Sequence, residues 1–328
     1  MTPEFQIIAD GADATAHFAD RLLSIEVIDE DGETADTVSI EIDNRDGRFA
    51  MPAENTRIEV WLGFRGQGLS MMGVYAVDAL SGTGPANTMT IGATAADMKG
   101  PIRAPRTRAW EDVTLGEIVS SIAGAAGLTA TCAPDLAERA FGYLAQTAES
   151  DLHFLTRIAR ELNATAKPAG GHLVVQARGA GQTAAGDAVP DVVMTPATLS
   201  SWDWQIDWRE PSDGIEAEYA DPDSGERGVA TAGGGATVTR LRHVHPTKVE
   251  AQDAAEAAKR RIDEGGLTLS AELAGFGPEF LAGARLTLSG FLPAQLDATW
   301  NITRVTHRLG GGALSTTIEA RRGAPKAE

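Results

Sequence analysis

Apolar and polar residues alternate with a period of two from Arg21 to about Ala93. Because successive side chains of a β-strand point to opposite faces of the sheet, this period indicates strands with one buried face. Turn residues separate the runs, as in Asp29-Glu30-Asp31-Gly32 and Asn44-Arg45-Asp46-Gly47. The predicted strands lie within residues 23–27, 38–42, 58–62, 74–80 and 89–93. Five short strands joined by turns predict a small antiparallel barrel or sandwich over residues 1–105.

The period changes to that of a helix after Pro105. Thr114-Leu115-Gly116-Glu117 is a capping box, in which the hydroxyl and the carboxylate each accept a backbone N–H at the start of a helix. Gly127 suits the end of that helix. The region continues with a predicted helix from Ser150, a strand over His172–Ala177 and an exit linker over Gly179–Gly186. Residues 106–186 are therefore expected to form an α/β module inserted between two β regions.

Strand patterns return after residue 200 and predict a second β-rich unit over residues 187–328. A second capping box, Thr247-Lys248-Val249-Glu250, opens a helix whose alanine stripe suits close packing on a sheet. The other predicted elements are strands within 202–208, 215–219, 237–244, 267–273, 285–288, 299–307 and 313–320, and a mobile glycine-rich loop over 221–235. The expected fold class is β-rich α+β, with two small antiparallel β-barrel-like domains and an inserted α/β module.

Composition excludes several classes of protein. The chain has 28 basic and 46 acidic residues and a net charge of −18, which disfavours specific nucleic-acid binding because phosphate contacts need clustered Lys and Arg. With Cys132 as the single cysteine, no intramolecular disulfide can form. The chain has no run of 18 apolar residues and no basic leader followed by an apolar stretch, so we expect a soluble protein without a membrane segment or export signal.

Histidines and the cysteine offer the clearest candidates for metal or catalytic chemistry. His243 and His245 lie two apart in a predicted strand, so both rings face one side and would suit a shared divalent metal. Spacing marks no third ligand, which favours exposed histidines at a strand end. His307 has no nucleophile or carboxylate at a diagnostic offset, and Cys132 has no basic neighbour to activate its thiol. The sequence therefore predicts no metal site and no cofactor.

Carboxylates and loops give no catalytic signature either. Two pairs of carboxylates each share one face of a predicted strand, Asp203 with Asp207 and Glu216 with Glu218. A glycosidase needs such a pair, but an acidic chain contains many pairs by chance. We therefore favour the interpretation that these carboxylates lie on solvated faces. Asp43-Asn44-Arg45-Asp46-Gly47 lacks the spacing of a calcium loop and is predicted as a turn. No phosphate-binding loop or nucleophile elbow occurs. We expect no catalytic residues and no enzyme activity.

Three tryptophans, Trp202, Trp204 and Trp208, share one face of a predicted strand. Such a face is either buried, in the core or in a subunit interface, or exposed as a platform for sugars. Alternation with aspartate favours the core or the interface.

Several stretches, taken in order, resemble the late control protein D family of contractile-tailed phages, relatives of the N-terminal hub region of type VI secretion spike proteins. The best match lies near the C-terminus, in Thr247–Ala258, Gly283–Phe291, Trp300–His307 and Ser315–Ala320. Earlier matches are Asp36–Asp43 with Asp46-Gly47, Ile58–Gly63, Glu149–Ala159 and His172–Val175. Each motif alone is loose, and the ordered set carries the resemblance over most of the chain.

The resemblance implies a structural baseplate hub: a homotrimer whose six barrel-like domains form a ring around an axial channel. Such a ring would join a six-fold tail tube to a three-fold spike, with tape measure and other baseplate proteins as further partners. It implies no catalytic, cofactor or metal residues, and because the chain stops at Glu328 without a needle-like extension, we expect the spike to be a separate protein. The expected location is a virion tail or tail-like particle, assembled in the bacterial cytoplasm. The alternative is a cell-wall-active or glycan-binding tail component.

Overall fold

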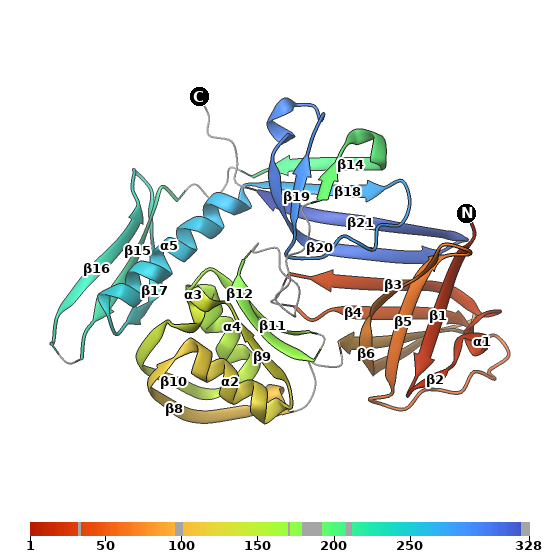
Figure 1. Cartoon of the computed structure of the whole chain (residues 1–328), viewed down its shortest axis with the longest axis horizontal. Helices are drawn as coiled ribbons and strands as arrows, with labels where there is room; N and C mark the ends of the chain where they lie inside the picture. Colours follow the sequence, from red (N-terminus) through yellow and green to blue (C-terminus); the bar gives the residue numbers. More distant parts are fainter. Residues whose placement is uncertain are drawn as a thin grey trace.

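The computed structural model describes residues 1–31, 34–95, 101–169, 171–178, 192–207, 212–222 and 224–322. Strands outnumber helices throughout, and the helices concentrate in the middle of the chain and in one long segment before the C-terminal strands (Figure 1). The predicted β-rich α+β class is confirmed. None of the helices in these ranges combines the length and apolarity needed to cross a membrane.

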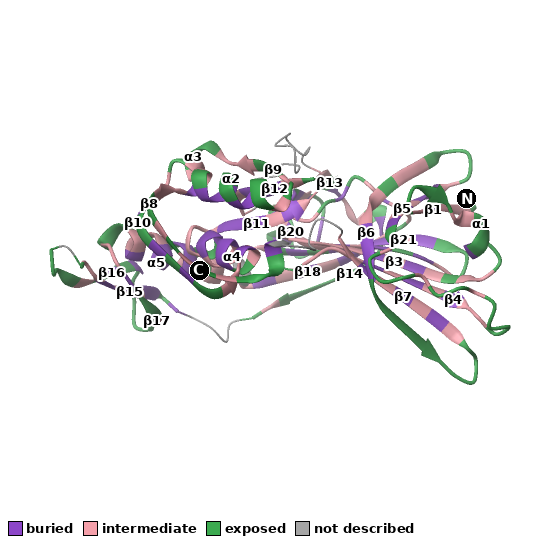
Figure 2. Ribbon diagram, turned by 90° about the horizontal axis from the view of Figure 1, so that it is seen from below, coloured by how far each residue is buried: buried purple, intermediate pink, exposed green. Residues whose placement is uncertain are grey.

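The N-terminal strands surround a core of branched aliphatic side chains. Val38, Ile40 and Ile42 are buried, and the residues between them are half-buried, as the period of two predicted. The elements are β1 (Pro3–Ala9), β2 (Ala12–Asp13), α1 (Thr15–Phe18), β3 (Leu22–Glu30), β4 (Thr37–Asp43), β5 (Arg57–Phe64), β6 (Gly68–Thr83) and β7 (Thr88–Ala95). The sequence analysis missed β1, which pairs antiparallel with β5. The outer part of β6, over residues 78–83, is exposed as it runs toward the turn before β7 (Figure 2).

The C-terminal strands enclose a second apolar core centred on Trp300. This indole is 1% exposed, and its Nε1 donates a hydrogen bond to the carbonyl of Leu296 at 3.0 Å. The strands are β13 (Val192–Met194), β14 (Leu199–Ile206), β18 (Leu267–Leu273), β19 (Arg285–Leu288), β20 (Thr299–Gly310) and β21 (Ala313–Arg322).

One continuous sheet joins these two sets of strands, because β3 pairs antiparallel with β20. The order is β14-β18-β21-β20-β3-β4-β7-β6-β5-β1-β2, with β13 and β19 attached beside β20, giving thirteen strands. Among the described residues this sheet forms no closed barrel, and the division into two barrel-like domains stays a prediction. Alternation shows which face of a strand is buried, but it carries no information about which strands are neighbours.

The central module has its own core and its own two small sheets. Thr114 caps its first helix through a complete capping box, and Gly127 ends that helix in the left-handed conformation, both as predicted. Ser150 caps the other long helix. The elements are β8 (Pro105–Thr114), α2 (Leu115–Ala126), β9 (Thr129–Cys132), α3 (Pro134–Ala137), β10 (Ala140–Ser150), α4 (Asp151–Glu161), β11 (Ala164–Ala169) and β12 (His172–Ala177). The antiparallel pairing of β8 with β10 was not predicted. The predicted linker 179–186 lies outside the described residues.

A separate three-stranded sheet carries the long helix α5 (Lys248–Gly265), which starts after Thr247 as predicted. Its strands are β15 (Gly214–Ala220), β16 (Arg227–Gly233) and β17 (Val238–His245), in the order β16-β15-β17. The prediction of a loop over residues 221–235 was wrong, because β16 pairs along the whole of β15. Its buried residues, Ala230 and Ala232, are small and poor strand formers, so its alternation is weak in the sequence. The alanine stripe of α5 packs on this sheet.

Ion pairs tie the central module to its neighbours. Lys167 of β11 reaches the carboxylates of Asp29 and Asp36 in the large sheet, with N–O distances of 3.2 and 3.4 Å. Arg139, before β10, pairs with Asp253 of α5. The module therefore contacts both the large sheet and the helix that covers the three-stranded sheet.

Candidate functional site

Strand β14 forms one edge of the large sheet and pairs with β18 on its inner side. Trp202 and Trp204 are 39% and 41% exposed. The Trp202 ring meets Phe291 edge-to-face, with centroids 5.5 Å apart. The core half of the prediction was therefore wrong for these two residues, and the interface half stays a prediction. Among the described residues, β14 has no strand on its outer side. Trp208 lies outside the described residues.

The exposed tryptophans leave the interface and the sugar-platform interpretations open. Their strand also carries Asp203 and, one residue beyond its end, Asp207, which are exposed. An exposed aromatic pair on an edge strand is a candidate surface for contact with another molecule.

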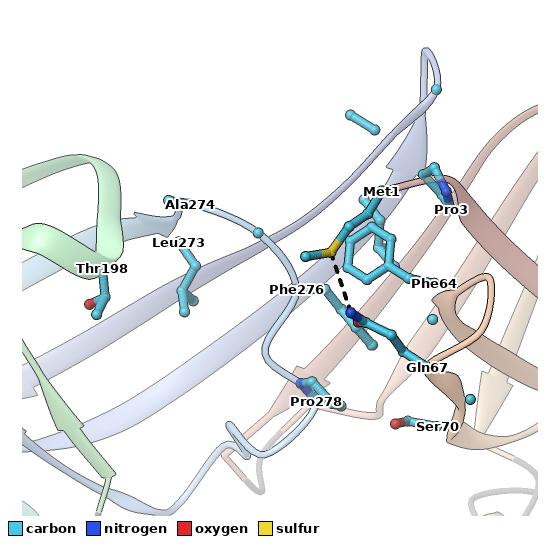
Figure 3. A pocket seen from close by; sticks show the side chains of 16 residues that line it. Met1, Pro3, Phe64, Gln67, Ser70, Thr198, Leu273, Ala274, Phe276 and Pro278 are labelled. Atoms are coloured by element: carbon cyan, nitrogen blue, oxygen red, sulfur yellow. Dashed lines mark hydrogen bonds between the residues drawn. The ribbon is translucent and has the colours of Figure 1, made fainter.

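An open groove of about 660 Å³ lies where the N-terminal and C-terminal parts of the large sheet meet (Figure 3). Met1, Phe64 and Gln67 line one side, and Leu273 and Phe276 line the other. Phe64 and Phe276 contact edge-to-face at a centroid distance of 6.4 Å. Among the described residues, no acidic, basic, histidine or cysteine side chain lines the groove, and its polar side chains are those of Gln67, Ser70 and Thr198.

The two histidines predicted to share a face lie at the end of β17 and differ in exposure. His243 is exposed, whereas His245 is 2% exposed, and their ring centroids are 4.8 Å apart. Burial, with a smaller effect from His243, lowers the pKa of His245 to about 4. Its Nε2 has no hydrogen-bond partner in the described part of the chain.

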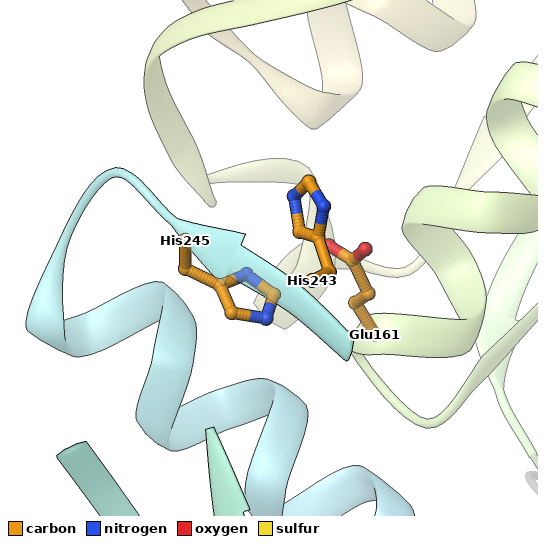
Figure 4. Close-up of side chains that lie close together, drawn as sticks. All are labelled: Glu161, His243 and His245. Carbon is orange, nitrogen blue, oxygen red and sulfur yellow. The ribbon is translucent and has the colours of Figure 1, made fainter. Parts of the chain in front are cut away.

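The structure adds Glu161, the last residue of α4, to the two histidines. One ligand atom from each of the three side chains lies within 4.8 Å of the other two (Figure 4). Burial raises the pKa of the Glu161 carboxyl. The cluster borders a groove of about 1080 Å³ between α4 and β17. Sequence spacing gave no sign of Glu161, because it belongs to a different layer of the molecule.

The other predicted candidates have local partners. His307 is 4% exposed, and its Nδ1 lies 2.9 Å from the hydroxyl of Thr316. Burial raises the pKa of the Cys132 thiol to about 11, which opposes formation of the nucleophilic thiolate. Glu216 and Glu218 both bind Arg240, at 2.7 and 2.8 Å.

The carboxylates of the Asp43–Gly47 segment pair with arginines. Asp43 pairs with Arg45, and Asp46 pairs with Arg21 through two hydrogen bonds of 2.7 and 2.6 Å. These contacts hold the carboxylates in a turn after β4. The prediction that the chain has no catalytic or cofactor-binding residue stays a prediction.

Comparison with known proteins identifies the family to which this chain is similar. A family model described as phage tail baseplate hub (GPD) matches residues 89–313. The proteins named "Probable baseplate hub protein" of Escherichia phage 186 and Escherichia phage P2 are each 28% identical to this chain. The first match covers 97% of this chain and 92% of the relative, and the second covers 97% and 93%.

Solved structures share the fold at lower identity. A 43 kDa tail protein of prophage MuSo2 from Shewanella oneidensis aligns with a TM-score of 0.74 and 14% identity, over 98% of both chains. The E. coli c3393 protein, a component of the type VI secretion system, aligns with a TM-score of 0.57 and 12% identity, over 98% of this chain and 79% of that one. The same arrangement of elements therefore occurs in tail proteins and in a secretion component.

Proposed function

This chain belongs to the phage tail baseplate hub (GPD) family, and from that membership we propose that it is a homotrimeric adapter joining a six-fold tail tube to a three-fold spike around an axial channel. It is a structural component of a phage tail and not an enzyme. The resemblance identified from the ordered sequence segments is confirmed by the family match and by the two phage relatives.

The arrangement of the large sheet supports the adapter. Its N-terminal and C-terminal parts each surround a separate apolar core. We propose that each part acts as one barrel-like unit, with residues 1–105 and 187–328 as the hub domains and residues 106–186 as the insert between them. Three copies of two units would present six similar surfaces to the tube and keep three-fold symmetry toward the spike.

The observation that carries the proposal is the edge strand β14 with its two exposed tryptophans. An uncovered strand edge presents backbone donors and acceptors, and natural proteins cover such edges to avoid non-specific pairing. Trp202 and Trp204 add the kind of large aromatic surface that is enriched at the centres of interfaces. We place the contact between neighbouring copies at this edge.

Light scattering on the purified protein over a range of concentrations tests the assembly. The wild-type protein should give about three times the chain mass of 34.3 kDa. A Trp202→Gln/Trp204→Gln variant should shift toward the monomer, because it removes the aromatic surface and leaves the strand itself intact.

The matched control changes another exposed apolar pair. Val229 and Val238, each 44% exposed, lie on the three-stranded sheet, and a Val229→Gln/Val238→Gln variant should trimerise as the wild type does. A wild-type protein that stays monomeric at every concentration and binds neither the cognate tube protein nor the spike would exclude the adapter. A tryptophan variant that trimerises normally would exclude β14 as the contact.

Partners and place of assembly follow from the adapter role. We propose that the trimer binds the tail tube on one side and the spike on the other, and that tape measure and baseplate proteins contact it during assembly in the bacterial cytoplasm. The net charge of −18 suits a channel wall to which DNA does not adhere.

Glycan binding remains the alternative for the same surface, because exposed tryptophans beside Asp203 also suit stacking on sugar rings. Cosedimentation with insoluble peptidoglycan distinguishes the two functions. Binding that disappears in the Trp202→Gln/Trp204→Gln variant would favour the glycan function, and we expect the wild type to remain in the supernatant.

A further inference from the structure

The groove between α4 and β17 contains three side chains of metal-ligating type that the proposed function above does not involve. Glu161 comes from the end of α4 in the central module, and His243 and His245 come from the end of β17 in the three-stranded sheet. Their ligand atoms lie within 4.8 Å of one another. Two separately folded layers of the molecule thus contribute to one cluster (Figure 4).

The buried ring of His245 is the observation that points to a missing ligand. The residue is 2% exposed, and its Nε2 has no hydrogen-bond partner within the described ranges. Buried side-chain nitrogens in folded proteins are nearly always satisfied by a hydrogen bond, an ordered water or a metal ion. A metal ion bound to Nε2 would supply the partner that the protein itself does not.

The types of ligand atom in the cluster indicate which metal ion it would bind. Two imidazoles and one carboxylate are typical ligands of Zn²⁺ and of neighbouring first-row divalent ions, whereas Ca²⁺ and Mg²⁺ favour sites built from oxygen atoms. Three protein ligands leave a fourth tetrahedral position for water. Ligand atoms around a tetrahedral zinc ion lie roughly 3–3.5 Å apart, so modest side-chain rotations would close the cluster.

Arginines border the same groove and would oppose a cation if they were directed at its ligands. Arg157 pairs with the carboxylate of Glu149 at 2.6 Å. Arg261 donates a hydrogen bond to the backbone carbonyl of Arg160. Both guanidinium groups therefore have other acceptors, although their charges still act on the Glu161 carboxylate and partly offset the rise in its pKa caused by burial.

We propose that Glu161, His243 and His245 bind one divalent transition-metal ion, with Zn²⁺ preferred, and that this ion fastens the three-stranded sheet to the central module. The ion would reinforce the Arg139–Asp253 pair that already links the module to α5. The sequence favoured exposed histidines because no third ligand was evident, and α4 supplies that ligand only in the folded chain. This site does not depend on trimerisation.

Titration of tag-free, metal-free full-length protein with ZnCl₂, followed by isothermal calorimetry, tests the site. We expect one equivalent of Zn²⁺ per chain and a higher melting temperature in its presence. His243→Ala and Glu161→Gln should each weaken Zn²⁺ binding by at least about tenfold, because each removes one ligand. The exposed ring of His243 contacts that of His245, so Glu161→Gln, which leaves both rings in place, is the cleaner of the two variants.

His153→Ala is the matched control, because His153 is an exposed histidine that borders the same groove. This variant should bind Zn²⁺ as tightly as the wild type. Substitution with Co²⁺ gives an independent readout, since coordination by imidazole and carboxylate should produce visible absorption bands that His243→Ala loses. The proposal is overturned if the wild type binds no stoichiometric Zn²⁺, or if His243→Ala and Glu161→Gln bind it as the wild type does.

Discussion

Two buried histidines show how surroundings decide the role of a residue. Burial lowers the pKa of both His245 and His307 to about 4, so both rings are neutral near pH 7. His307 is satisfied by the hydroxyl of Thr316 and packs against Phe276, with ring centroids 5.3 Å apart. His245 lacks a partner for Nε2. His307 is therefore part of the core, whereas the unpartnered nitrogen of His245 is the group for which we propose a metal ion.

His307 should make the protein less stable in mild acid. Its pKa falls from about 6.5 in the unfolded chain to about 4 in the folded one, with a small opposing effect from Asp29. The unfolded chain therefore takes up the proton first as the pH falls, and the free energy of unfolding decreases between about pH 6.5 and 4. The full loss is on the order of 3 kcal/mol.

A His307→Gln variant keeps a hydrogen-bonding side chain next to Thr316 but cannot be protonated. Urea unfolding at about pH 7 and about pH 4.5 should show a smaller loss of stability in this variant than in the wild type. Equal losses in the two proteins would show that His307 does not contribute to the acid sensitivity.

Helix α5 shows what a stripe of small residues does for an element. Ala251, Ala255 and Ala258 are buried against β15 and β16, and their short side chains let the helix approach the sheet closely. Small residues also make β16 difficult to predict from the sequence, because its buried face consists of alanines. Helix starts were easier to predict, since the caps at Thr114, Ser150 and Thr247 act within one turn.

Enlarging the contact face of α5 should destabilise the protein. Ala255→Leu adds volume at a fully buried position and should lower the free energy of unfolding by about 1–3 kcal/mol through overpacking. Glu256→Leu adds a leucine at the neighbouring exposed position and should change it by less than about 0.5 kcal/mol. Chemical denaturation of both variants measures the difference, and equal effects would mean that the helix does not pack closely on its sheet.

At the scale of the whole molecule, the two ends of the chain depend on each other. Strand β3 pairs with β20, and Arg304 and Arg308 of β20 reach Glu30 and Glu26 of β3, at 2.6 and 3.1 Å. Leu309 and Leu314 belong to the core that the N-terminal strands surround. The central module, by contrast, completes its core and its strand pairing within residues 101–178.

Isolated fragments should reveal this difference. A fragment of residues 101–178 should fold cooperatively by itself, as judged by circular dichroism and thermal unfolding. A fragment of residues 1–95 should aggregate or lack a cooperative transition, because it exposes the edge of β3 and lacks two of its core leucines. A soluble, cooperatively folding 1–95 fragment would show that the large sheet is not one folding unit.

Local patterns in the sequence determined the β-rich class, the faces of most strands, the positions of the helix caps and, through an ordered set of loose motifs, the hub family. Each of these depends on residues a few positions apart or on their order along the chain. The tertiary structure alone decided that β3 joins β20 in one sheet, that Trp202 and Trp204 are exposed on an edge, and that Glu161 meets His243 and His245. These features arise from contacts between segments far apart in the chain, and a period of two or of 3.6 residues contains no information about such contacts.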